Sequence, residues 1–237
     1  MPTLDGAVVL VTGANGGIGT QFVHEALARG AAKVYASART PRTWDDERVV
    51  PLTLDVTDAA SIQAAVEAAP DVTVLINNAG ASVSSTGILT HTEEEIRRNV
   101  ETNFLGPLFL ARAFAPVLSA KDESVLIDMH SLLSWYAVAG IYSATKAALW
   151  SATNSLRLEL APAGVHVVGV HVGYVDTPMA AYAPEPKVDP AVLVRDVFDA
   201  VQAGQYEVLA DEGSVQAKAG LSAPIEAVYP QLKAARA

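Results

Sequence analysis

A tyrosine and a lysine four residues apart are the side chains best suited to chemistry in this chain. Tyr142 and Lys146 stand in the segment Tyr-Ser-Ala-Thr-Lys, and Ser131 precedes them. Positions i and i+4 of a helix share one face, so a phenol and an ammonium would reach the same pocket. The phenol can give a proton to a reacting oxygen, and a nearby cation favours its ionised form. An ordinary helix-surface pair has the same spacing, so the pattern needs support from other motifs.

That support comes from a glycine-rich turn near the N-terminus. An apolar run ends at Thr12 and is followed by Gly-Ala-Asn-Gly-Gly-Ile-Gly, residues 13–19, after which helical periodicity begins. Glycines let the backbone approach a pyrophosphate closely, and the free N–H groups of the next helix meet its negative charge. The strand before the turn and the helix after it favour a dinucleotide cradle over a plain turn.

Composition and charge limit the classes of protein that this chain can belong to. The chain has 237 residues, 51% of them hydrophobic, which suits one α/β domain spanning 1–237. It has no cysteine, which excludes thiol nucleophiles and thiolate metal sites, and we predict no metal. A net charge of −10 argues against nucleic acid or an anionic membrane as partner. The N-terminus has neither a basic region nor an apolar signal segment, so we expect a cytoplasmic protein.

Apolar runs alternate with amphipathic segments along the chain, which indicates a doubly wound α/β fold. Seven strands of a parallel sheet are predicted at 7–12, 33–38, 49–54, 72–77, 124–129, 166–171 and 207–210. Helices are predicted at 17–30, 58–69, 92–119, 142–161 and 190–203, with a capping box of Thr92 and Glu95. Residues 39–48 include Pro41 and are too few for a full crossover helix. Residues 177–190 are rich in proline and are predicted to form a substrate lid.

Several separated motifs together resemble the short-chain dehydrogenase/reductase family. They are the loop spacing Gly13-x-x-x-Gly17-x-Gly19, Asn77-Asn78-Ala79-Gly80, the asparagine at 103, and Tyr142 with Lys146, and the resemblance runs from Thr12 to about Met179. It implies a Rossmann fold with strand order 3-2-1-4-5-6-7 and an NADP-dependent carbonyl reductase or alcohol dehydrogenase. It also implies a homodimer or homotetramer formed through the fourth and fifth helices.

The resemblance assigns roles residue by residue. Tyr142 becomes the proton donor, Ser131 the hydrogen-bond donor to the substrate oxygen, Lys146 the group that grips the nicotinamide ribose, and Asn103 the holder of a relay water. We expect Lys146 and the positive nicotinamide to favour the Tyr142 phenolate. The implied cofactor-binding residues are Gly13, Asn15, Gly16, Gly17, Ile18, Gly19, Arg39, Asp55, Val56, Asn78, Ala79, Gly80, Tyr142, Lys146, Gly173, Val175 and Thr177. Asp55 could instead be an ordinary turn aspartate.

Three positions depart from the family pattern. Ser131 precedes Tyr142 by eleven residues, about two fewer than in most members, which leaves Ser134 as a rival. His130 occupies a place where the family often has a serine, and could be a second acid or a strand-end histidine that faces away. Val172 stands where a proline usually precedes Gly173.

The end of the second strand decides which nicotinamide cofactor is expected. A carboxylate there would hydrogen-bond the ribose 2′-hydroxyl and repel a 2′-phosphate. The chain instead has Ala38 and then Arg39, whose guanidinium suits a phosphate, so we predict NADP(H). Arg42 could assist, or could pair with Asp45 or Asp46.

The predicted lid favours a neutral, largely apolar carbonyl or alcohol as the small-molecule substrate. It carries Met179 and Tyr182, with Lys187 as its only cation. We predict a substrate-binding set of Ser131, Tyr142, Tyr136, Met179 and Tyr182. Trp135 and Tyr136 could also pack against the protein itself, and Trp150 is expected at a helix or subunit interface.

Two other functions share parts of this pattern. A related fold could use the bound cofactor for epimerisation or dehydration. A dinucleotide-sensing protein could keep the fold without catalysis, but it would have no reason to keep Asn103, Ser131, Tyr142 and Lys146 together.

Overall fold

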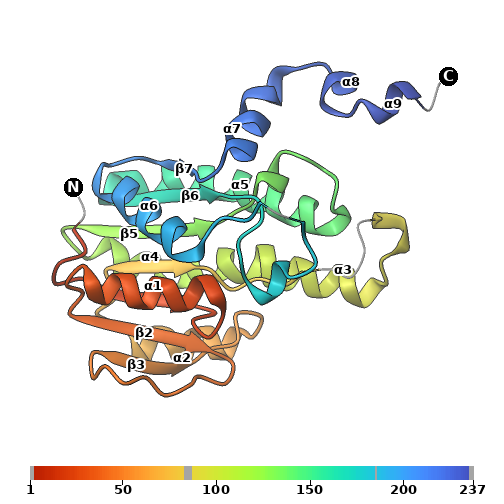
Figure 1. The fold of residues 1–237 in the computed structure, drawn as a ribbon. Coiled ribbons are helices and arrows are strands. Elements are labelled where there is room, and N and C mark those ends of the chain that lie inside the picture. The colour runs from red at the N-terminus through yellow and green to blue at the C-terminus, as the bar shows by residue number, and fades with distance from the viewer. Residues whose placement is uncertain (1–2, 83–86, 185, 235–237) are drawn as a thin grey trace.

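The centre of the molecule is a seven-stranded parallel sheet. The computed structural model describes residues 3–82, 87–184 and 186–234. The strands are β1 Val8–Thr12, β2 Lys33–Ala38, β3 Val49–Thr53, β4 Val74–Asn77, β5 Ser124–Met129, β6 Val165–His171 and β7 Glu207–Leu209. All neighbouring pairs are parallel, in the order β3-β2-β1-β4-β5-β6-β7 (Figure 1). The predicted sheet and strand order are confirmed, with strand ends within two residues.

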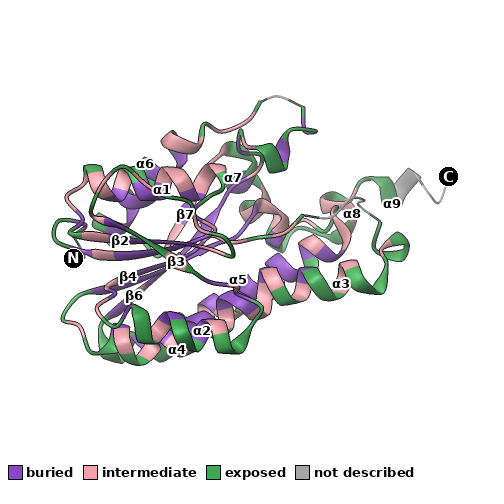
Figure 2. Ribbon diagram, turned by 90° about the horizontal axis from the view of Figure 1, so that it is seen from below, coloured by how far each residue is buried: buried purple, intermediate pink, exposed green. Residues whose placement is uncertain are grey.

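Helices cover both faces of the sheet, as Figure 2 shows. Helices α1 Gly17–Ala28 and α6 Pro190–Gln202 lie on one face, and α2 Ala59–Ala68, α4 Gly106–Ser119 and α5 Gly140–Leu160 on the other. Side chains alternate along each strand, so Val9 and Val11 pack toward α1 while Leu10 packs toward α2 and α4. Both faces are therefore apolar, which explains the continuous hydrophobic runs of the sequence.

The predicted helix 92–119 is interrupted by a π-helical turn. Helix α3 Glu93–Val100 begins with the predicted capping box, and the π-helical turn Glu101–Leu105 separates it from α4. Pro107 lies in the first turn of α4 and has no N–H with which to bond the carbonyl of Asn103 four residues earlier. The Asn103 carbonyl therefore lacks its usual helical partner.

Connections complete the fold, and one of them is as short as predicted. Residues 39–48 join β2 to β3 without a helix. Short 3-10 turns occupy Ile88–Thr90, Leu132–Ser134, Ala161–Ala163, Pro178–Ala180 and Gly220–Ser222. Within the described ranges, no helix is long and apolar enough to span a bilayer.

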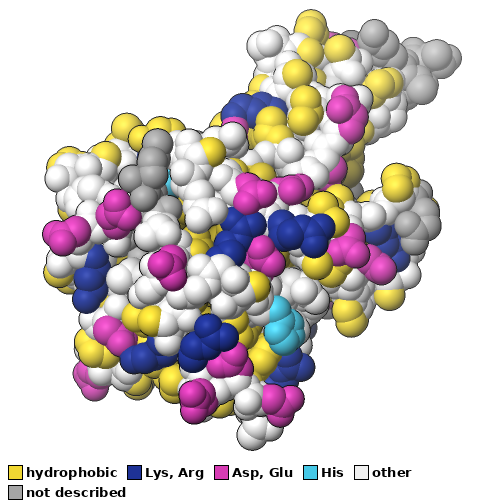
Figure 3. Space-filling view, turned by 60° about the vertical axis from the view of Figure 1, so that its left-hand side comes forward, with side chains coloured by type: hydrophobic (Ala, Val, Ile, Leu, Met, Phe, Trp, Pro, Cys, Tyr) yellow, Lys and Arg dark blue, Asp and Glu magenta, His cyan; other side chains and the backbone are white. Residues whose placement is uncertain are grey.

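The C-terminal helices were not predicted. Helices α7 Glu212–Ala219, α8 Ile225–Val228 and α9 Gln231–Ala234 form an arm that extends beyond the body of the molecule (Figures 1 and 3). Leu221, Ile225 and Leu232 on this arm are exposed. The helices are short and weakly amphipathic, so their sequence carries little of the periodicity that marks the longer helices.

The turn from β1 into α1 has no room for a side chain at Gly19. A Cβ there would lie 2.3 Å from the Gly13 carbonyl oxygen, and Gly13 itself has a φ of 66°. We expect Gly19→Ala to destabilise the protein by about 1–3 kcal/mol, because backbone atoms must move to accept the methyl group. Urea unfolding measures this change. Gly220→Ala is the control, since a Cβ at Gly220 meets nothing within 4 Å. Equal stability of the two variants would contradict the prediction.

Candidate functional site

The motif residues gather at the carboxyl ends of β1 and β4, where the strand order reverses. Ligands of doubly wound sheets bind at this switch point. The Thr12 hydroxyl accepts hydrogen bonds from the backbone N–H groups of Asn78 and Ala79, both at 2.9 Å. The Asn78 amide donates back to the Thr12 carbonyl at 2.8 Å. These bonds fix the loop after β4 beside the glycine loop.

The glycine loop leaves space and backbone donors at the start of α1. Gly16 caps the helix without a side-chain bond, so the first N–H groups of α1 point into the loop. A Cβ at Gly17 would lie 2.7 Å from the Thr177 side chain. The segment after β6 thus lies against the glycine loop, and the residues predicted to meet the two ends of a dinucleotide are neighbours.

Two arginines follow β2 beside this loop. Arg39 is exposed and contributes to lowering the pKa of Asp55. Arg42 stacks on Trp44, with the guanidinium 4.0 Å from the ring centroid, and contacts the Thr20 hydroxyl of α1 at 3.4 Å. The Asn15 amide donates to the Thr40 carbonyl at 2.8 Å and ties the two loops together.

The alternative pairing of Arg42 is not observed. Arg48 is the partner of Asp46, at 2.7 Å, and that carboxylate is held by both the side chain and the backbone of Arg48.

Asp55 has the local contacts of a turn residue, because one carboxylate oxygen accepts from the Thr57 N–H and hydroxyl, which lowers the pKa of Asp55. Val56, beside it, is buried.

Tyr142, Lys146 and Ser131 meet where α5 packs on the end of β5. Lys146 is 6% exposed, and its ammonium donates to the Met129 carbonyl at 2.7 Å and lies 5.8 Å from the centroid of the Tyr142 ring. The Ser131 hydroxyl lies close enough to the Tyr142 phenol to act on its pKa, and it donates to the Val172 carbonyl at 3.3 Å. The spacing of Tyr142 and Lys146 on one helix face therefore brings both groups to the same place, as predicted.

Burial sets the protonation of both groups. It lowers the pKa of Lys146 to about 8, with Asp128 acting against this shift. It raises the pKa of Tyr142 to about 12, with the Ser131 hydrogen bond acting against that shift. We expected Lys146 and the positive nicotinamide together to lower the pKa of Tyr142. The side chains of the protein do not lower it by themselves, because the Lys146 ammonium donates to the Met129 carbonyl and not to the phenol oxygen.

Asn103 is fully buried, and its side chain holds the loop after β4. Its oxygen accepts from the Ala81 N–H at 2.7 Å, and its amide donates to the Ala81 carbonyl at 2.8 Å and to Asn99 at 3.1 Å. Both amide hydrogens are thus used within the protein. The backbone carbonyl, whose partner four residues on would be the absent N–H of Pro107, is a further acceptor at this position.

The shortened loop after Ser131 is held from inside. Ser134 is buried and its hydroxyl accepts from the Ser131 N–H at 3.4 Å, so it supports Ser131 rather than replacing it beside Tyr142. Trp135 does not line a cleft, because its ring stacks on His171 with centroids 3.8 Å apart. Trp150 is half-buried and packs edge-on against Trp135, with ring centroids 5.8 Å apart. Its place at a helix or subunit interface stays a prediction.

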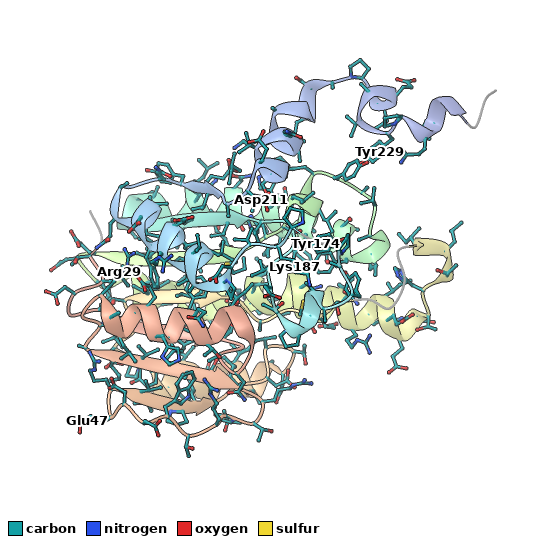
Figure 4. The ribbon with its side chains drawn as sticks, viewed as in Figure 1. Arg29, Glu47, Tyr174, Lys187, Asp211 and Tyr229 are labelled. Atoms are coloured by element: carbon teal, nitrogen blue, oxygen red, sulfur yellow. The ribbon has the colours of Figure 1, made fainter. Side chains whose placement is uncertain are left out.

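The C-terminal arm reaches this loop through a tyrosine that sequence reasoning missed. Tyr229 stacks on Tyr136 with ring centroids 5.2 Å apart, and its hydroxyl accepts from the Ala137 N–H at 2.9 Å. Figure 4 shows Tyr229 beyond the body, above the end of the sheet. No local pattern identifies this contact, because it joins positions about ninety residues apart.

A second missed residue, Asp211, anchors the segment that follows β6. Its carboxylate accepts from the Gly173 N–H and also caps α7 through the Ser214 N–H. Val172, at the position that departs from the family pattern, accepts from the Leu132 N–H at 3.0 Å through its carbonyl. Figure 4 draws Asp211, Tyr174 and Lys187 toward the middle of the view, and Arg29 and Glu47 at its left.

Two side chains of the predicted lid, residues 177–190, are largely open to solvent. Met179 is 49% and Tyr182 76% exposed, and the Tyr182 ring meets that of Tyr174 edge-on at 6.3 Å. Backbone bonds between Asp176 and Val188, and between Val188 and Tyr174, close the base of this segment, where Val175 is buried. Glu185 lies outside the described residues.

Among the residues described, no group of three or more His, Asp or Glu side chains could hold a metal ion.

Comparisons with known proteins agree with this geometry. Residues 7–187 match the profile of the family described as short chain dehydrogenase. The chain is 30% identical over 193 residues, 75% of its length and 74% of the relative's, to an NADP-dependent 3-hydroxy acid dehydrogenase of Schizosaccharomyces pombe.

Solved structures of similar proteins superpose over nearly the whole chain. A short chain dehydrogenase from Burkholderia cenocepacia in complex with NADP is 34% identical, with a TM-score of 0.91 over 98% of this chain and 99% of that one. One from Sphingobium yanoikuyae in complex with NADPH is 27% identical, with a TM-score of 0.78 over 90% and 92%. The chain therefore belongs to the short-chain dehydrogenase/reductase family, as its motifs predicted, and is an oxidoreductase of that family.

Proposed function

We propose that this protein is an NADP(H)-dependent oxidoreductase that reduces a neutral, largely apolar ketone or aldehyde, or oxidises the matching secondary alcohol. The observation that carries the proposal is the meeting of Tyr142, Ser131 and Lys146 at the edge of the sheet that also holds the glycine loop. A proton donor and a dinucleotide cradle on one edge are what carbonyl reduction requires.

The residues present fit a dinucleotide. The loop has no side chains at Gly13, Gly16, Gly17 and Gly19, and a Cβ at two of these glycines would collide with Thr177 or with the Gly13 carbonyl. The N–H groups at the start of α1 can meet a pyrophosphate. Asp55 and Val56 would line the adenine, Asn78, Ala79 and Gly80 the adenosine side, and Gly173, Val175 and Thr177 the nicotinamide. The cofactor supplies the hydride when bound.

The protein's part is to orient the carbonyl and to protonate its oxygen. A phenol whose pKa is about 12 keeps its proton throughout the neutral range, which suits the donor of the reductive direction. The Ser131 hydroxyl, beside that phenol, would turn from the Val172 carbonyl to donate to the same substrate oxygen and stabilise its developing charge. Lys146 would hold the ribose, and a water on the Asn103 backbone carbonyl would link Lys146 to solvent.

The preference for NADP(H) is proposed from the end of β2. Arg39 and Arg42 both lie beside the glycine loop, and a guanidinium binds phosphate in a bidentate manner. Two similar solved structures hold NADP or NADPH, and the yeast relative is named NADP-dependent. These observations support a 2′-phosphate between the two arginines.

The substrate class is proposed from the side chains around Tyr142. Met179 and Tyr182 of the lid are exposed, and Tyr182 lies close enough to raise the pKa of Tyr142. Tyr136, stacked on Tyr229, adds an aromatic ring in the loop before α5. Apolar and aromatic surfaces beside a single proton donor suit a neutral carbonyl compound.

Assembly and location are proposals of the same kind. We propose a homo-oligomer through α4 and α5, which carry the exposed side chains Phe109 and Leu158. A groove lined by residues of both helices, among them Leu108, Arg112 and Leu156, lies between them. The cytoplasmic location stays a prediction.

Tyr142 is the proposed proton donor. Tyr142→Phe removes the phenol proton but keeps the ring, so carbonyl reduction should fall by about 10²-fold or more. NADPH binding, followed by fluorescence titration, should be unchanged. Tyr206→Phe is the control, because Tyr206 is an exposed tyrosine that packs on His166 and Arg157. Turnover of the Tyr142 variant at the wild-type rate would refute the assignment.

Arg39 is the residue proposed to select NADPH over NADH. Arg39→Ala should raise the KM for NADPH by about tenfold or more and leave that for NADH nearly unchanged, because only the former carries a 2′-phosphate. Steady-state kinetics with both cofactors decide the question. Arg48→Ala, in the same connection but paired with Asp46, should leave the ratio of the two KM values unaltered. An Arg39 variant with an unaltered ratio would count against the proposed phosphate site.

Burial of Lys146 makes the stability of the protein depend on pH. The pKa of Lys146 is 10.5 in its ordinary state and about 8 in the fold, so between these values the unfolded chain binds more protons. Stability of the wild type relative to Lys146→Met should therefore rise with pH across that window, by about 3 kcal/mol in all. Urea unfolding from pH 7 to 10.5 measures it, with Lys121→Met as control. A difference that stays flat with pH would contradict it.

A further inference from the structure

The C-terminal arm, helices α7 to α9, contacts two segments of the candidate site. The arm leaves the body after β7 and runs outward from the sheet (Figure 1). One of the two segments is the loop of residues 132–139, which joins Ser131 to α5, and the other follows β6. The arm touches them at its base, along α7 and at Tyr229. The reaction proposed above gives the arm no role, so these contacts need an account of their own.

The base of the arm lies against the segment that follows β6. The Asp211 carboxylate accepts from the Gly173 N–H, and its other oxygen accepts from the Ser214 N–H of α7 at 2.7 Å. A Cβ at Gly173 would lie 2.9 Å from Leu132 Cδ2 and 3.0 Å from Asp211 Oδ2. The start of the arm, the segment after β6 and the loop after Ser131 therefore meet at one glycine.

Helix α7 is fixed between the edge of the sheet and the loop. The Lys218 ammonium pairs with Glu207 of β7 and lies 5.7 Å from the centroid of the Trp135 ring. Trp135 is buried and stacks on His171, so the cation lies against a ring that the body of the molecule already holds. The middle of the arm is therefore anchored beside the loop.

Tyr229 holds the loop at the far end of the arm. Its ring stacks on that of Tyr136, with centroids 5.2 Å apart and 4° between the planes. Its hydroxyl accepts from the Ala137 N–H at 2.9 Å. One side chain thus contacts two successive residues of the loop, the first through the face of its ring and the second through its hydroxyl. A ring that makes both contacts has a defined position, so the arm and the loop fix each other.

The loop has a second anchor on its inner side. Residues 135–139 form no helix or strand, so their backbone has no regular ladder of hydrogen bonds. The Ser143 hydroxyl donates to the Tyr136 carbonyl and accepts from the Ala139 N–H, both at 3.1 Å. Ser143 directly follows Tyr142 on α5. The loop is therefore tied on one side to the helix that carries the proposed proton donor, and on the other side to the arm.

The outer helices of the arm depend on the same contact. Helices α8 and α9 have four residues each, and helices this short are marginal in water without packing. Leu221, Ile225 and Leu232 are exposed, so these apolar side chains do not form a core for the arm. Tyr229 lies between the two helices and packs on the loop. Loss of its contacts should therefore release the end of the arm and the loop together.

We propose that the C-terminal arm is a clamp that holds residues 132–139 and so orients Ser131 and Tyr142 toward one substrate oxygen. Tyr229 is its main positioning residue, since it acts through Tyr136 and Ala137. The effect of the clamp on turnover rests on the proposed function, whereas its hold on the loop does not.

Hydrogen exchange tests the hold on the loop without any substrate. Tyr229→Phe keeps the stacked ring and removes the acceptor of the Ala137 N–H, so that amide should exchange about tenfold faster or more than in the wild type. NMR spectra of the full chain, followed in D₂O and by saturation transfer for fast amides, measure the rate. The amides of β5 should keep their rates and show that the fold is intact. An unaltered rate at Ala137 would overturn the proposal.

Turnover tests the effect on Ser131 and Tyr142. Tyr229→Leu loses both the stack and the hydroxyl, so kcat should fall roughly tenfold to hundredfold, while Tyr229→Phe should lose only about threefold. NADPH affinity should be unchanged, because the glycine loop and Arg39 keep their contacts. We express kcat per NADPH-binding site, counted by titration. A merely structural role would lower the number of sites and the urea midpoint, and would leave kcat per site at the wild-type value.

The matched control is Ile225→Ala, an exposed residue one turn before Tyr229 on the same arm. It should behave as the wild type in both measurements. Full kcat per site in Tyr229→Leu, or an equal loss in Ile225→Ala, would overturn the proposal. If Tyr229→Leu does not fold, the exchange rate and kcat of Tyr229→Phe decide it. Failure of the wild type to reduce any carbonyl would refute the proposed function instead, and the exchange rate at Ala137 would still decide the hold on the loop.

Discussion

The candidate site depends on how helix α5 is held against the end of strand β5. The buried contact of the Lys146 ammonium with the Met129 carbonyl, at 2.7 Å, fixes the helix in rotation and along its axis. Once that contact is made, Tyr142 one turn earlier faces Ser131, and Thr153 two turns later faces Asp128. A shift of one residue along α5 would turn all three side chains about 100° away from the sheet.

This contact has a cost that the rest of the core must offset. A lysine that is 6% exposed, an aspartate and two histidines are all withdrawn from water beneath one helix. The two apolar layers, with fully buried side chains such as Phe22, Phe114 and Phe198, supply the burial that makes such polar groups tolerable. The same burial raises the pKa of Tyr142 to about 12, which keeps the phenol protonated at neutral pH. It also lowers the pKa of Lys146 to about 8, which brings the titration of the ammonium close to neutral pH.

Regular elements could be predicted from the sequence because their signals are local and repeated. Seven apolar runs gave the sheet, and the capping box of Thr92 marked the start of α3. The π-helical turn was missed, since its cause is the absent N–H of Pro107 within an otherwise helical pattern. The C-terminal arm was missed because its helices are too short to show a period.

Within the candidate site, contacts between distant segments escaped prediction. The stack of Tyr136 on Tyr229 and the bond from Gly173 to Asp211 join segments that no spacing rule connects. Trp135 was an open choice between cleft and core, and the ring of His171 decided it. Arg42 was likewise open until Trp44 and Thr20 were seen as its partners. Motifs thus named the chemical groups, while packing determined which neighbours they meet.

In the proposed reaction, hydride passes from the nicotinamide to a substrate carbon beside Tyr142. The most direct test is to supply NADPH deuterated at C4 of the nicotinamide, together with aldehydes, aromatic ketones, steroids and thioester ketones, and to analyse the products by mass spectrometry. We expect an alcohol product carrying one deuterium on the former carbonyl carbon for each NADPH consumed. The two forms of NADPH labelled on opposite faces of the ring are tested in turn. An alcohol without deuterium from either form, or no NADPH consumption with any of these carbonyls, would refute hydride transfer to the substrate.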